Sequence, residues 1–180
     1  METQGLDSDL ASPATVHGEA LPATVAWLGY GGLLPFIVLA AASMLDHHHA
    51  FFWVDGLLAY GAVILSFVGA LHWGFAMSLL ANLTDGERAL RNLRFIWSVI
   101  PALVAWLALL LPPSVASCLL IAGFITNYWQ DRRVAVVVSL PAWYLPLRLR
   151  LSVVACLCVA LGGLSGVWSD PEALLHVDYL

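Results

Sequence analysis

Apolar residues follow one another in five long stretches of the chain, separated by short polar segments. A helix needs roughly 20 predominantly apolar residues to cross the ~30 Å hydrocarbon core of a bilayer, at about 1.5 Å per residue. We expect the spans at residues 23–45, 56–81, 95–111, 114–130 and 149–167. The pattern therefore predicts an all-α fold: an integral membrane bundle of about five transmembrane helices, forming one domain over residues 23–168.

Prolines and glycines interrupt these stretches at positions that predict kinks and turns. Pro35 lies in the middle of the first span, after Gly29, Gly31 and Gly32, and predicts a kink there. The pair Pro112-Pro113 cannot continue a helix and predicts a tight hairpin between the third and fourth spans.

The polar segments predict where the helices end. We expect residues 82–94 to form a basic loop and Asp131-Arg132-Arg133 to close the fourth span, which needs Trp129 and Gln130 to approach the bilayer thickness. Residues 134–146 are apolar but contain two prolines and are too short to span. Trp143 and Tyr144 favour an interfacial position for this segment, since aromatic rings settle at the membrane surface.

The composition supports lipid as the solvent of the chain. It is 61% hydrophobic and 11% charged, whereas a water-soluble domain carries roughly a quarter charged residues. No basic patch exists outside the arginine segments, which argues against nucleic-acid binding. Residues 1–22 and 169–180 are acidic tails. The first is expected to be disordered and resembles neither a secretory signal nor a mitochondrial transit peptide, because it has no arginine or lysine.

All the basic side chains gather on one side of the predicted membrane. The chain has seven arginines and no lysine, in two clusters: Arg88, Arg91 and Arg94, then Arg132, Arg133, Arg148 and Arg150. With five spans both clusters lie on the side of the N-terminus, where they can face anionic headgroups as topology anchors. The positive-inside rule predicts a bacterial inner-membrane protein with the N-terminus in the cytoplasm and the C-terminus outside. The mitochondrial inner membrane is the alternative.

Small residues recur at every fourth position of the second span. This ladder consists of Ala62, Ser66, Ala70, Gly74 and Ser78. Such a pattern lets a second helix backbone approach closely. We interpret it as a helix-packing surface, within the bundle or toward other membrane-protein subunits.

His72 is the only ionisable residue well inside a predicted span, and intramembrane ionisable groups are functional candidates. Three functional roles remain open: a proton relay, a ligand to haem or metal, and a contact to a small molecule such as a quinone, with Trp73 and Tyr30 as further contact candidates. The structural alternative is a hydrogen bond to a neighbouring helix. A haem held by two histidines needs a second one at similar depth, which this chain lacks. The sequence identifies no cofactor.

Two further groups of polar residues are candidate sites: the histidine run at 47–49 and the pair Asn127 and Asp131. Consecutive side chains on a helix diverge by about 100°, so His47, His48 and His49 can share a metal only if they form a loop, and a polar cap is the simpler interpretation. Asn127 and Asp131 lie on one helix face, where Asp131 can pair with Arg132, Arg148 or Arg150. No catalytic residues are assigned, because no metalloprotease, hydrolase or nucleotide-binding motif is present.

Several motifs together resemble a known family. They are Leu28–Phe36 (LGYGGLLPF), Tyr60–Gly74 (YGAVILSFVGALHWG), Trp97–Pro101 (WSVIP), Asp131, and Leu140-Pro141 with Trp143-Tyr144 and Leu147-Arg148. Over roughly residues 25–165 the chain is similar to the transmembrane protein 69-like family, small multi-pass membrane proteins defined by a domain of unknown function. The resemblance implies the topology and no mechanism.

Two functions from different classes fit these features. The first is a non-enzymatic accessory or assembly factor that packs against other membrane helices through the small-residue ladder. The second is a protein that binds or transports a quinone, a lipid or a proton-coupled solute around His72, with the proline-containing first and third spans lining a cavity.

Overall fold

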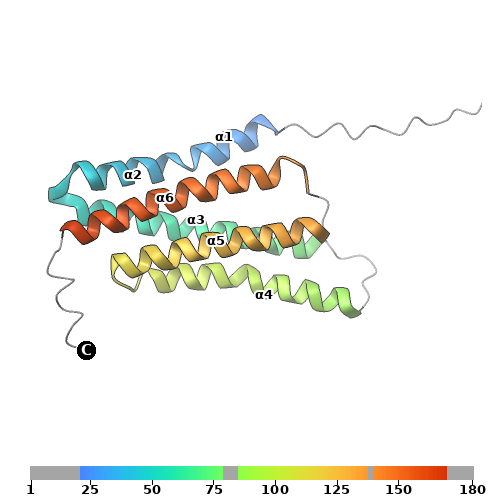
Figure 1. Cartoon of the computed structure of the whole chain (residues 1–180). Coiled ribbons are helices and arrows are strands. Elements are labelled where there is room, and N and C mark those ends of the chain that lie inside the picture. The colour runs from blue at the N-terminus through green and yellow to red at the C-terminus, as the bar shows by residue number, and fades with distance from the viewer. Residues whose placement is uncertain (1–20, 79–84, 138–139, 170–180) are drawn as a thin grey trace, which may run out of the picture.

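The computed structural model describes residues 21–78, 85–137 and 140–169, and these residues form helices with no strand. The predicted acidic tails lie almost entirely outside them. The helices are α1 (Ala23–Gly31), α2 (Leu34–Leu45), the 3₁₀ helix η1 (His47–His49), α3 (Ala50–Ser78), α4 (Asp85–Ala108), α5 (Pro113–Val137) and α6 (Tyr144–Ser169). Figure 1 shows the long helices side by side, with their axes roughly aligned.

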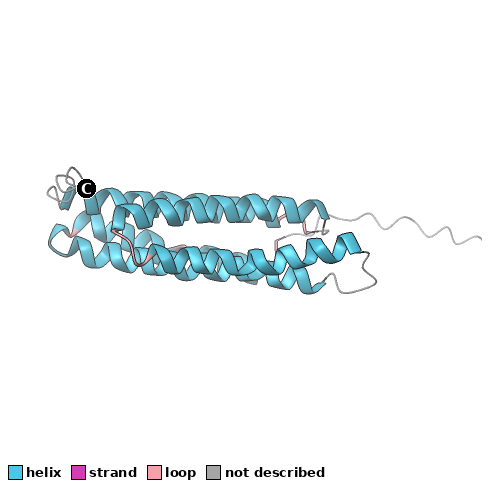
Figure 2. Cartoon of the chain, turned by 90° about the horizontal axis from the view of Figure 1, so that it is seen from below, coloured by secondary structure: helices cyan, strands magenta, loops and turns pink. Residues whose placement is uncertain are grey.

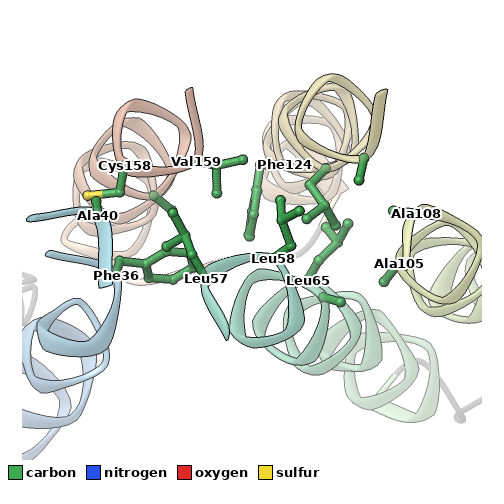
Figure 3. Close-up of a cluster of buried hydrophobic side chains, with 14 of the residues drawn as sticks. Phe36, Ala40, Leu57, Leu58, Leu65, Ala105, Ala108, Phe124, Cys158 and Val159 are labelled. Atoms are coloured by element: carbon green, nitrogen blue, oxygen red, sulfur yellow. The ribbon is translucent and has the colours of Figure 1, made fainter. Parts of the chain in front are cut away.

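The helices pack in two staggered layers, α2, α3 and α4 in one and α6 and α5 in the other (Figures 2 and 3). α3 is central, because it packs against α2, α4, α5 and α6. The core between the layers contains the fully buried Phe36, Leu57, Leu65, Leu120 and Val159. Large apolar side chains also cover the outer surface, for example Phe67 and Trp106, which are 65% and 62% exposed. Lipid is the solvent that such a surface fits, which confirms the membrane bundle.

Among the described residues, three segments are long and apolar enough to cross a membrane: Ala23–Leu45, His47–Met77 and Tyr144–Ser165. The first of them comprises α1 and α2. Within α4 a shorter apolar stretch covers Asn92–Ala108. α5 packs against α3, α4 and α6. When α1 and α2 are counted as one segment, the bundle has the predicted number of long helical segments.

Three predicted boundaries are wrong. α4 begins at Asp85, so most of the expected loop 82–94 is helical, as its alternating Glu, Arg and Leu residues allow. α5 continues through Asp131-Arg132-Arg133 to Val137 and is therefore not short. Residues 134–146 are not one separate segment, because α5 continues to Val137 and α6 begins at Tyr144, with Pro146 in its first turn. Their interfacial position stays a prediction.

The predicted helix breaks are present. α1 and α2 are separated at Gly32 and Leu33, with Pro35 in the first turn of α2. The hydroxyl of Tyr60 on α3 donates to the Gly32 carbonyl at 2.8 Å, so a backbone acceptor at the break is satisfied from a neighbouring helix. Pro113 opens α5, which confirms the hairpin after α4.

The residues of the small-residue ladder do not lie along the surface where α3 packs against α4. Ala62 is buried and the Ser66 hydroxyl bonds its own helix at the Ala62 carbonyl, whereas Ala70 is exposed and a Cβ added to Gly74 would meet nothing within 4 Å. The side chain of Ser78 is outside the described part. Each step of four residues turns by about 40° around a helix, so the ladder rotates from the interior to the surface. The close approach is at Gly69 instead, where a Cβ would lie 2.7 Å from Cβ of Pro101.

Candidate functional site

A buried carboxylate joins two helices near the arginine-rich end of the bundle. Asp131 of α5 is 0% exposed, and its Oδ2 accepts a hydrogen bond from Nε of Arg148 of α6 at 2.8 Å. Arg148 is itself 7% exposed. Two charges withdrawn from water in this way are tolerated because they neutralise each other.

A third helix reaches the same carboxylate. Nε2 of His72 on α3 lies 3.5 Å from Oδ1 of Asp131, and the Tyr144 hydroxyl lies 3.5 Å from that oxygen. These separations are longer than a strong hydrogen bond. The ring of Phe75 packs edge-on between those of His72 and Tyr144, with centroids 6.0 Å from each. Asp131 thus connects α3, α5 and α6.

Several buried polar atoms toward this end of the bundle have no hydrogen-bond partner. Among the described residues they belong to His72, Arg94, Trp97, Asn127, Gln130 and Trp143. They lie in the parts of α3, α4 and α5 near the arginine-rich end, or next to the start of α6. Buried polar groups normally have partners, so this concentration marks a place where the protein can bind something polar.

An apolar cavity of about 300 Å³ adjoins the ion pair. It lies between α1–α2, α3 and α6, where α1 diverges from the bundle and packs mainly against α6. Its walls include Gly29, Leu33, Phe36, Val68, Leu71, Leu151 and Ala155. Its polar lining residues are Ser152 and, toward the arginine-rich end, Trp143, Tyr144 and Arg148. The cavity is therefore apolar along its length and polar at one end.

The three predicted contact residues are not brought together. His72 is 1% exposed and belongs to the buried cluster. Trp73 is about half exposed and packs against Phe95 of α4, with ring centroids 5.0 Å apart. Tyr30 is exposed, with its hydroxyl 3.5 Å from Nη1 of Arg150. Of the proline-containing helices, α1–α2 lines the cavity and α4 does not.

The arginines fall into two groups by burial. Arg132, Arg133 and Arg150 are exposed, as anchors at a membrane surface should be, and Arg133 stacks 3.9 Å over the ring of Trp129. Arg94 and Arg148 are buried, so the expectation that all seven face headgroups does not fit them. Arg88 and Arg91 lie in α4, and their side chains are outside the described part.

The histidine run forms a cap at the opposite end of the bundle. Asp46 begins the single turn of η1, where its carboxylate accepts bonds from Trp53 Nε1 at 3.2 Å, His49 Nδ1 at 3.0 Å and the His49 backbone N–H at 3.3 Å. The indole N–H of Trp53, and then His49, hold the pKa of the Asp46 carboxyl below its ordinary value. Over the residues placed in the structure, no three His, Cys, Asp or Glu side chains are grouped as a metal site would require. His47, His48 and His49 are exposed.

Sequence reasoning missed the meeting of His72, Asp131 and Arg148. Of the three partners considered for Asp131, the structure selects Arg148. The burial of Arg94 and Asn127 was also missed. One signal was available: Asn127 and Asp131 share a face of α5, and that face is buried at both positions.

Comparison with known proteins places this architecture in a family. The family described as "Protein of unknown function (DUF3429)" matches residues 21–164. Transmembrane protein 69 of Xenopus tropicalis is 33% identical over 159 residues, which cover 86% of this chain and 59% of that protein. The chain thus spans less than two thirds of the length of this relative. No solved structure matches the chain. The chain is a multi-pass membrane protein that belongs to the DUF3429 family, described as proteins of unknown function, and it is similar to transmembrane protein 69.

Proposed function

We propose that this protein binds an amphipathic small molecule, with its apolar body in the cavity beside α1–α2 and its polar end at Arg148. The observation that carries the proposal is the asymmetry of this cavity. Its walls are apolar, and one end meets a buried arginine, a tyrosine and the unpartnered indole N–H of Trp143. Ligand sites typically combine such apolar walls with a few convergent polar groups.

The chemistry of the polar end narrows the ligand class. Arginine and indole N–H groups donate hydrogen bonds and accept none, so they favour a ligand with a carbonyl, carboxylate or phosphate oxygen. A quinone or a lipid has both this head and an apolar body. His72 does not line the cavity; it lies beside Asp131, which in turn bonds the cavity-lining Arg148, so it would act on this ligand indirectly.

Filling the cavity should reduce occupancy by the bound molecule. In Val68→Trp the larger ring would occupy space that the ligand needs, whereas Val63→Trp on the exposed face of the same helix would not. We expect the Val68 variant to retain at most about a tenth of the lipid or quinone that co-purifies with wild type in mild detergent. A steric penalty of only ~1.4 kcal/mol already lowers the binding affinity tenfold. Mass spectrometry of the extracted molecules measures this.

Equal occupancy in the Val68 and Val63 variants, or no stoichiometric molecule in wild type, would sink the proposal. Thermal melting of both variants shows whether the bundle is intact. If Val68→Trp does not fold, Leu71→Trp tests the same wall from a half-buried position.

An accessory or assembly role is the second candidate. The observation that favours it is the open space over Gly74 and the exposure of Ala70, which leave room for a helix of another subunit against α3. Mild-detergent purification separates the two candidates. A stoichiometric protein that is lost in Gly74→Leu but kept in Val68→Trp supports the accessory role.

We further propose that the arginine-rich end faces the cytoplasm of a bacterium, or the matrix if the membrane is the mitochondrial inner one. α1 begins, and α3 and α5 end, at this end of the bundle, whereas α6 ends at the other (Figure 1). A reporter fused after Val137 should therefore be active on the cytoplasmic side and one fused after Ser169 on the outside. Both reporters on the same side would mean that α6 does not cross the membrane.

A further inference from the structure

The interior between α3, α4 and α5 holds a positive charge that no described carboxylate balances. Arg94 of α4 is 7% exposed, and its buried Nη1 has no hydrogen-bond partner. The other buried arginine, Arg148, is neutralised by Asp131. Buried charges in proteins are normally paired, most strictly within a membrane.

The packing contacts place this arginine in one layer with the unpartnered groups of the neighbouring helices. α3 and α4 are antiparallel, with Gly69 against Pro101 and the Trp73 ring against Phe95. At about 1.5 Å per residue this puts Arg94 within roughly one turn of the level of His72.

α5 contributes to the same layer. It runs parallel to α3, with Gly123 against Leu65 and Asp131 against His72. Gln130 therefore lies at the level of His72, and Asn127 lies about one turn from it, on the side away from the arginine-rich end. Asn127 is 1% exposed, and neither of its amide atoms has a partner.

The chemistry of this layer is complementary to an anion. Its unpartnered donors are Nη1 of Arg94, Nε1 of Trp97 and Nδ2 of Asn127, and its unpartnered acceptors are the side-chain oxygens of Asn127 and Gln130. We propose that this layer binds a small oxyanion, a carboxylate or a phosphate group, with Arg94 as its counter-charge. Amide oxygens beside the donors suit a ligand that also carries a hydroxyl or a protonated oxygen.

This site is separate from the cavity described above, because the residues of this layer do not line that cavity. It therefore extends the proposed function and does not depend on it. A free anion and the headgroup of an anionic lipid present the same oxygens, and the experiment distinguishes these two sources.

The test uses the purified full chain and its thermal unfolding midpoint, because a ligand that binds only the folded state raises this midpoint with its concentration. Inorganic phosphate and acetate are titrated against chloride at equal ionic strength in detergent. In parallel, nanodiscs of phosphatidylglycerol are compared with nanodiscs of phosphatidylcholine. The variants are Arg94→Met, which keeps an apolar stem without the charge, and the matched control Arg133→Met at an exposed position.

We expect wild type and Arg133→Met to be stabilised by the anion, and Arg94→Met to need about tenfold or more of it for the same effect, the factor typical of one lost charge-assisted hydrogen bond. Stabilisation by phosphate or acetate identifies a free anion; stabilisation by phosphatidylglycerol alone identifies a headgroup. If no probe stabilises wild type, or if the two variants respond alike, the site does not exist. Should Arg94→Met fail to fold, Trp97→Phe removes one donor and keeps the ring size similar, and an unchanged anion response in it overturns the proposal.

Discussion

Replacing Asp131 by Asn should lower the free energy of unfolding by about 3–5 kcal/mol, the range observed when one member of a buried ion pair is removed. The asparagine has nearly the same shape but leaves Arg148 buried without a counter-charge. Equilibrium unfolding in a detergent–dodecyl sulfate series measures the change. The control Asp55→Asn alters an exposed acid of α3 and should change stability by less than about 0.5 kcal/mol.

A double-mutant cycle shows whether the pair itself is responsible. Arg148→Met alone should be destabilising in the same way, since it leaves Asp131 buried and charged. Asp131→Leu completes the cycle: alone it leaves Arg148 unpaired, whereas combined with Arg148→Met it removes both charges and should recover most of the loss, because apolar replacements of buried ion pairs are often neutral. Additive effects of the two single changes would refute the coupling.

Gly69→Ala should be the most damaging small substitution on α3, by about 1–3 kcal/mol, the usual cost of overpacking. Its Cβ would lie 2.7 Å from Cβ and 2.8 Å from Cγ of Pro101, whose ring cannot move aside, so α3 and α4 must separate. Thermal melting of the variant in one detergent gives the shift. Gly74→Ala is the matched control on the same helix: it has open space and should gain up to about 0.5–1 kcal/mol from helix propensity. Similar shifts at both glycines would show that the close approach of α3 and α4 does not limit stability.

The fold was predictable from the sequence to the extent that the bilayer dictates it. A helix satisfies its own backbone hydrogen bonds within lipid, so each long apolar stretch was expected to become one. The boundaries at residues 85–94 and 131–137 were not predictable in the same way. Charged residues there resemble a loop, yet a helix that begins or ends beyond the hydrocarbon core keeps its backbone bonds whatever the side chains.

The candidate site was predictable in part. His72 was identified because a lone ionisable residue stands out in an apolar stretch. Its partners were not, because whether residues 72, 131 and 148 meet depends on the rotation of three helices about their axes. The ladder did not predict the contact between α3 and α4 for a related reason: spacing of four residues drifts around the helix, and the close approach at Gly69 lies one position before Ala70.

The break between α1 and α2 divides the first span into two units of unequal local stability. No residue of α1 is buried, whereas Phe36, Ala40 and Ser43 of α2 are. Pro35 has no backbone N–H, so it cannot donate a helical hydrogen bond across the break. The Tyr60 hydroxyl of α3 bonds the Gly32 carbonyl and so holds the break against α3. α1 can therefore open without unfolding α2, and its backbone amides should belong to the fast-exchanging class of the molecule. Because α1 forms one wall of the cavity, this local opening would widen the cavity toward the lipid.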